Sequence, residues 1–143
     1  MSDNFRAFSA EIGHFAEHDV PQAVQDVTAK IGLQALRGVV NKTPVDTGRA
    51  RGNWQASLGS PVASTTNAKD PSGEAPLASS AQTSTYSREA PTVLSVPPFG
   101  TIWLSNNLPY IQRLESGTWS GQAPHGMVAV TVAEIESQFR RIE

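Results

Sequence analysis

Large apolar side chains recur at helical spacing near the start of the chain. Their offsets of three, four and three place them on one face of a predicted helix over residues 3–17; they are Phe5, Phe8, Ile12 and Phe15. Such a stripe packs either in a core or against a partner. Because three phenylalanines on one helix need a cover, we expect this face to pack against another subunit.

A second helix is predicted to begin at the break formed by residues 18–21, with Pro21 in its first turn. It should end near residues 41–43, because Pro44 disfavours the α conformation of the residue before it. Apolar positions cover so much of this helix that we expect it to lie between two layers. Gly32 and Gly38 each cost about 1 kcal/mol relative to alanine, so they predict close packing against backbone.

Short strands are predicted after these helices. Trp54, Ala56 and Leu58 alternate with polar residues, which predicts a half-buried strand. Two more strands are predicted at residues 93–96 and 101–105, on either side of a Pro-Pro-Phe-Gly turn.

The last part of the chain combines both periodicities. Pro109 should open a short helix that ends at Glu115, with Gly117 as its left-handed C-cap. Alternation then predicts a strand at residues 127–132, and helical spacing predicts a terminal helix over residues 132–142. The predicted fold is α+β, with two N-terminal helices packed on a small, mostly antiparallel sheet, a long inserted loop and a C-terminal helix.

The composition changes between residues 59 and 92. Of these 34 residues, 24 are Gly, Ala, Ser, Thr or Pro, which leaves little apolar surface to bury. We therefore expect residues 1–143 to form a single domain with residues 59–92 as a long flexible excursion. It should carry a short helical turn around residues 78–88 and gain order against a partner.

Composition and charge exclude several classes of function. The chain has 143 residues, no cysteine and a formal net charge of −2, so thiolate sites are excluded and a basic field for nucleic acid is absent. Its apolar runs are too short to cross a bilayer, and its start does not resemble a secretory signal. We expect a soluble protein without membrane contact, made in a reducing compartment.

No catalytic motif is recognisable, so neither an enzyme nor a cofactor is expected. His14 and His18 have the i, i+4 spacing of metal ligands on a helix, and His125 is the third histidine. Carboxylates such as Asp19 or Glu115 could join them, but no third ligand stands out by its spacing. Surface or capping roles are favoured, and no metal site is predicted.

Lys42, Arg49 and Arg51 form the one local basic feature. Arginines at a turn-to-strand junction can contact phosphates. The alternative, favoured by the weak overall charge, is that they pair with carboxylates such as Asp46 or bridge subunits.

Two segments resemble the signatures of one phage family. Residues 43–54, TPVDTGRARGNW, are similar to the TPVDTGRLRGSW signature of small neck and tail-completion proteins of long-tailed bacteriophages, the minor tail protein Z-like family. Residues 101–117, TIWLSNNLPYIQRLESG, followed by SGQAP at residues 120–124 and by residues 126–128, resemble its second signature. The likeness covers about residues 21–140.

The resemblance implies a virion structural protein that forms a ring, usually hexameric, at the junction between the capsid connector and the tail. It also implies which residues build the signature turns and neighbouring elements, either for folding or for subunit contacts: Asp46, Thr47, Gly48, Arg49, Arg51, Trp54, Asn106, Asn107, Pro109, Tyr110, Glu115 and Gly117.

We therefore expect a tail-completion or neck protein of the phage particle, assembled in the cytoplasm of the host bacterium. Its expected partners are copies of itself, other neck and tail proteins (connector or stopper, tail terminator or tube), and genomic DNA that passes through the ring without sequence-specific binding. The alternatives are another tail component, such as a tail-terminator or tail-tube subunit, and a nucleic-acid-binding module.

Overall fold

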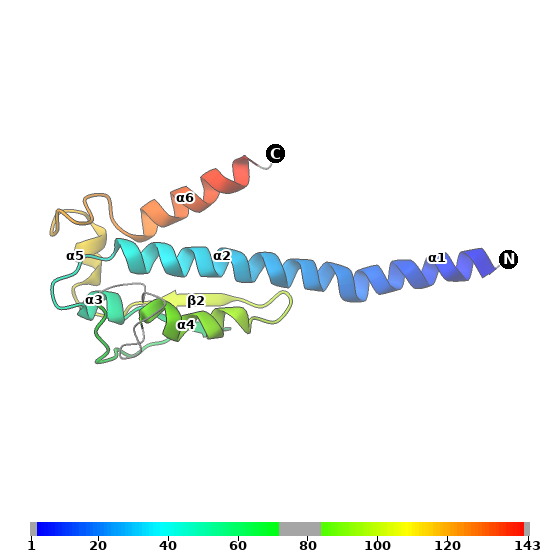
Figure 1. Ribbon diagram of the computed structural model, residues 1–143, viewed down its shortest axis with the longest axis horizontal. Coiled ribbons are helices and arrows are strands. Elements are labelled where there is room, and N and C mark those ends of the chain that lie inside the picture. The colour runs from blue at the N-terminus through cyan, green and yellow to red at the C-terminus, as the bar shows by residue number, and fades with distance from the viewer. Residues whose placement is uncertain (1–2, 72–83, 142–143) are drawn as a thin grey trace.

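The computed structural model describes residues 3–71 and 84–141, which form an α+β fold (Figure 1). Its elements in chain order are α1 (Asp3–His14), the π-helical turn η1 (Phe15–Asp19), α2 (Val20–Lys42), α3 (Arg49–Gly52), β1 (Gln55–Leu58), α4 (Thr85–Leu94), β2 (Ile102–Ser105), α5 (Ile111–Glu115) and α6 (Val128–Arg140). Among the described residues, no helix is both long and apolar enough to span a bilayer.

α1, η1 and α2 form one continuous helix, so the predicted break at residues 18–21 is wrong. Val20 donates its N–H to the carbonyl oxygen of Phe15, five residues earlier, and this wider turn lies directly before Pro21. A proline inside an α-helix removes one hydrogen bond and pushes its ring against the carbonyl four residues before it. The π turn accommodates the ring, and α1 continues outward beyond the rest of the molecule (Figure 1).

α2 lies between two layers, as its apolar pattern predicts. α4 and β2 lie on one side of it and α6 on the other (Figure 1). The main core consists of Leu36, Val39, Val40, Trp54, Ala56 and Val93. A Cβ on Gly32 would lie 2.7 Å from Val93, and one on Gly38 would lie 2.5 Å from Thr131. Both glycines therefore allow close packing, although the neighbours are side chains and not the backbone that was predicted.

The sheet consists of two antiparallel strands, in which Ala56 of β1 pairs with Leu104 of β2. β1 lies where alternating apolar residues predict it, and β2 lies in the strand predicted at residues 101–105 after the Pro-Pro-Phe-Gly turn. A second buried cluster joins α3 and α5 to the chain before α6, and its members are Ala50, Leu108, Leu114, Ala123 and Met127.

Two further predicted strands are helical. Residues 93–96 contain the end of α4, which begins after the N-cap Ser84 and buries Val93 against α2. Residues 127–132 contain the start of α6, because the carboxylate of Glu115 accepts the first N–H groups of that helix. A short apolar run does not distinguish a strand from a helix, and here tertiary contacts decide.

The excursion is shorter than predicted. From Thr85 onward it is the helix α4, and Thr85 is fully buried. Residues 60–71 are hydrogen-bonded to residues 48–57 at several points. Residues 72–83, with the first part of the turn predicted around 78–88, lie outside the described residues.

Candidate functional site

Arg51 of the first signature is held by backbone oxygens of the fold itself. Its guanidinium donates to the carbonyl oxygens of Pro71 at 3.3 Å, Asn41 at 3.3 Å and Thr43 at 3.2 Å. Burial lowers the pKa of Arg51, and the negative charge of Asp70 acts in the opposite direction. Because the planar fork of an arginine reaches several acceptors at once, Arg51 joins the end of α2 to the segment that ends at residue 71.

Asp70 is the second centre of this network. Its carboxylate accepts the N–H of Thr85 at 2.7 Å, and its own N–H donates to the carbonyl of Gly48 at 2.9 Å. Gly48 has φ +84°, and a Cβ there would lie 2.6 Å from the Asp70 carbonyl carbon. The turn of the first signature therefore requires glycine both for its backbone conformation and for space.

Several residues that complete this network lie within the predicted excursion, and the sequence analysis missed them. Besides Asp70 and Thr85, Arg88 donates to the carbonyl oxygens of Gly52 at 2.9 Å and Trp54 at 3.1 Å. Their only signal in the sequence is that Asp70 and Arg88 belong to two pairs of adjacent opposite charges, Lys69-Asp70 and Arg88-Glu89, in a stretch of small residues.

Asn53 and Trp54 complete the first signature. Asn53 is fully buried; its amide donates to the carbonyl of Arg49 at 2.8 Å and accepts the N–H of Thr66 at 2.9 Å. The indole N–H of Trp54 donates to the hydroxyl of Thr43 at 2.7 Å. The signature thus ties the end of α2, α3 and the start of β1 into one unit.

The second signature packs directly on the first. Asn106 donates its side-chain N–H to the carbonyl of Ala50 at 2.8 Å. Asn107 donates to the carbonyls of Val62 at 2.7 Å and Ser64 at 3.1 Å, and so holds the chain after β1. The structure therefore brings the two predicted groups of residues together.

Glu115 and Gly117 connect this unit to α6. The Glu115 carboxylate accepts the N–H groups of Met127 at 2.8 Å, Val128 at 2.9 Å and Ala129 at 3.0 Å. Burial acts to raise the pKa of Glu115, but these three hydrogen bonds outweigh it and hold the pKa below its ordinary value. Gly117 has φ +79°, the left-handed conformation predicted for it.

A pocket of about 400 Å³ opens between the two signatures. Its lining residues are Pro44, Val45, Asp46, Thr47, Gly48, Arg49, Ala50, Tyr110, Leu114, Trp119, Ser120 and Gln122. Trp119 is 60% exposed, and the guanidinium of Arg113 lies 4.7 Å from the centre of its ring. The lining offers aromatic surface and charges of both signs, which suits the binding of a partner.

The remaining signature residues lie on the rim of this pocket or beside it. Asp46, Thr47 and Arg49 are exposed, and Pro109 is exposed immediately before Tyr110. Within residues 3–71 and 84–141, no hydrogen bond or ion pair involves the side chains of Asp46 and Arg49. These two charged groups are therefore available to a partner.

The predicted stripe on α1 is exposed to solvent. Phe5, Phe8, Ile12 and Phe15 have 58, 59, 52 and 57% of their surface exposed, and α1 contains no buried residue. The fold of one chain therefore leaves this face uncovered.

The histidines and basic residues occupy separate places. The rings of His14 and His18 lie 4.7 Å apart on the projecting helix, and no group of three metal-ligating side chains occurs within the part of the chain that is described.

Lys42 forms a 2.8 Å ion pair with Glu134 of α6. Together with the enclosure of Arg51, this leaves Arg49 as the exposed member of the three basic residues.

Comparison with known proteins gives no relative. No family model matches the chain, and searches of curated proteins and of solved structures find no match either.

Proposed function

We propose that this protein is a structural component of a bacteriophage particle, of the tail-completion or neck type. Copies of the chain form a ring at the head–tail junction, which joins the tail to the capsid connector and leaves a passage for DNA. The observation that carries this proposal is the uncovered face of α1. Contiguous apolar surface on a projecting helix is typical of a protein that works in an assembly.

The roles of the signature residues support the same conclusion. Arg51, Asn106 and Glu115 bond to backbone groups, so they build the subunit and do not act on a substrate. The surfaces that remain available are the α1 stripe and the pocket rim with Asp46 and Arg49. A subunit with a rigid, internally bonded body and uncovered outer faces suits a ring.

The positions of the basic residues favour this function over nucleic-acid binding. Arg51 donates to three carbonyl oxygens and Lys42 pairs with Glu134, so of the three residues of the basic feature only Arg49 is available to phosphates. A weakly charged lumen suits DNA that must slide through it.

The test is to locate the chain in intact particles. Mass spectrometry of purified virions should detect it in several copies per particle, and gold-labelled antibodies should mark the head–tail junction. Absence from particles would overturn the proposal. Label along the tail shaft would instead support the alternative of a tail-tube subunit.

A further inference from the structure

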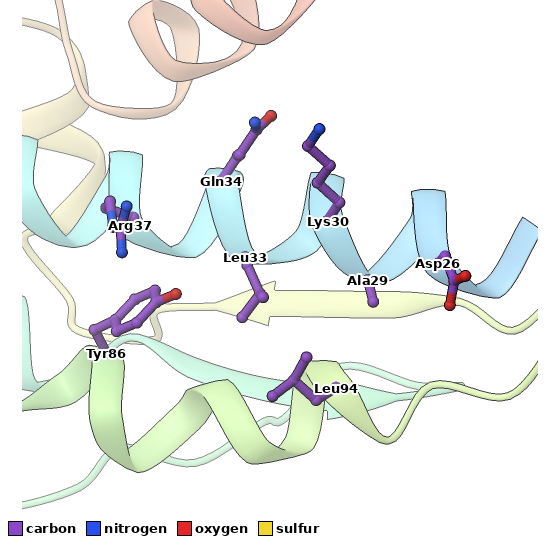
Figure 2. A pocket seen from close by; sticks show the side chains of 8 residues that line it. All are labelled: Asp26, Ala29, Lys30, Leu33, Gln34, Arg37, Tyr86 and Leu94. Atoms are coloured by element: carbon purple, nitrogen blue, oxygen red, sulfur yellow. The ribbon is translucent and has the colours of Figure 1, made fainter. Parts of the chain in front are cut away.

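A groove of about 410 Å³ lies between α2 and α4 (Figure 2). Both helices line it: Ala29, Leu33, Tyr86 and Leu94 supply apolar surface, and Asp26, Lys30, Gln34 and Arg37 supply polar groups. Leu33, Tyr86 and Leu94 point into the space between the helices, whereas Lys30 and Gln34 point away from α4 (Figure 2). Leu94 is 58% exposed at one wall. The groove is thus an apolar channel with a polar rim, a surface that suits an amphipathic helix.

The exposed stripe on α1 matches this groove in length. Lining residues on α2 run from Asp26 to Arg37, which at helical rise spans roughly 17 Å. The stripe from Phe5 to Phe15 spans roughly 15 Å by the same measure. One helix face can therefore fill the groove along most of its length.

The helix α1 does not reach the groove of its own chain. It continues from α2 through η1 in nearly the same direction, and its N-terminal end lies far from α4 (Figure 1). We propose that the α1 stripe of one copy docks in the α2–α4 groove of the next copy. This inference rests on the proposed function and specifies the contact that builds the ring.

The charges of the two surfaces are complementary. Residues 3–19 carry four carboxylates and one arginine. The groove carries Lys30 and Arg37 against the single carboxylate of Asp26, and Arg37 lies over the ring of Tyr86 at 5.0 Å. Opposite net charge favours the approach of an acidic helix to this groove.

The area of the stripe is also sufficient. An aromatic side chain presents about 150–250 Å², so four large side chains that are more than half exposed supply roughly 400 Å² of apolar surface. One side of a standard interface buries about 800 Å², of which somewhat more than half is apolar. The stripe thus supplies most of the apolar area of such an interface. The polar groups beside it supply the polar area.

A stripe-to-groove contact is head-to-tail, so each copy uses both surfaces with different neighbours. Such contacts form a ring where the rotation between successive copies closes, and an open filament where it does not. Sedimentation of the full-length chain should therefore show concentration-dependent assembly. Phe8→Glu in the stripe and Leu94→Glu in the groove should each weaken it at least tenfold, whereas Ala10→Glu, on the opposite face of α1, should assemble as the unchanged chain does. All three side chains are exposed, so the substitutions should not disturb the fold. Circular dichroism verifies that the helices remain.

Mixing the two defective variants gives the decisive result. The Phe8→Glu chain keeps an intact groove and the Leu94→Glu chain an intact stripe, so the mixture should form a complex of two chains and stop there. If Leu94→Glu alone assembles as the unchanged chain does, the stripes pack against each other and the proposal is overturned. A mixture that yields no complex of the two variants overturns it as well. Unchanged assembly of Phe8→Glu, or a monomeric unchanged chain at millimolar concentration, also overturns it. Detection of the chain in virions decides the proposed function separately.

Discussion

The side-chain amide of Asn106 donates a 2.8 Å hydrogen bond to the carbonyl oxygen of Ala50. This hydrogen bond links the two signature segments through residues that lie 56 positions apart in the chain. It also places α3 beside the turn that leads from β2 into α5, where Ala50 and Leu108 belong to the same buried cluster. The signatures therefore describe one structural unit.

Replacement of Asn106 by alanine should destabilise this unit. The substitution removes the shorter of two hydrogen bonds to the Ala50 carbonyl, which keeps the Asn53 N–H at 3.3 Å, and it removes the acceptor of the Leu108 N–H. We therefore expect a loss of about 1–2 kcal/mol in the free energy of unfolding. Denaturant titration measures it. Gln112→Ala, at an exposed position of α5, serves as the control and should change stability by less than about 0.5 kcal/mol.

Replacement of Gly48 by alanine should cost at least about 2 kcal/mol, because it combines strain at positive φ with a clash against the Asp70 backbone. Two other glycines separate these effects. Gly59 has φ +80° with open space around it, and Gly121 has open space without a positive φ. Thermal unfolding should rank the losses as Gly48→Ala, then Gly59→Ala, then Gly121→Ala. A loss for Gly59→Ala equal to that for Gly48→Ala would show that the clash has no cost.

The cap formed by Glu115 predicts a dependence of stability on pH. Because its pKa in the folded protein lies below the ordinary value of 4.5, its contribution is complete above that pH and is lost as the pH falls through the folded-state pKa. At pH 7, Glu115→Gln should unfold about 1 kcal/mol more easily than the unchanged chain, as expected for a weakened N-terminal cap.

That difference should shrink as the pH is lowered below 4.5, which chemical denaturation at a series of pH values measures. The control is Glu136→Gln, at an exposed position of α6, which should show no comparable difference at any pH. A gap between the Glu115→Gln variant and the unchanged chain that stays constant down to pH 3 would contradict the cap.

Arg51 and Arg49 should differ sharply when each is replaced by lysine. A lysine at position 51 cannot reach three carbonyl oxygens from a single ammonium group, so Arg51→Lys should lose roughly 2 kcal/mol of stability. Arg49→Lys, at an exposed position, should remain within about 0.5 kcal/mol. Equal effects would mean that the carbonyl contacts of Arg51 do not stabilise the fold.

The local sequence pattern was sufficient to predict an element where its apolar residues fit only one periodicity, helical or strand. It predicted the stripe of α1 and the strand β1, while turn and cap residues predicted β2 and the left-handed Gly117. It failed at residues 93–96 and 127–132, where three and five apolar residues fit both periodicities. It also failed at Pro21, because the π turn before it lets one helix continue through a residue that usually begins or ends one.

For the candidate site, the signatures identified residues that do lie together, but not what each of them does. Arg49 and Arg51 are two positions apart in the same motif, and nothing local distinguishes them. The sequence by itself determined the amphipathic face of α1 and the positions of both strands, since these depend on spacing along one segment. Only the tertiary structure decided that three carbonyl oxygens hold Arg51, that Glu115 starts the last helix at residue 128, and that the α1 face is uncovered. Each of these features depends on residues that are far apart in the sequence and come together in the fold. Packing of the whole chain brings them together, and the local sequence around each residue does not determine it.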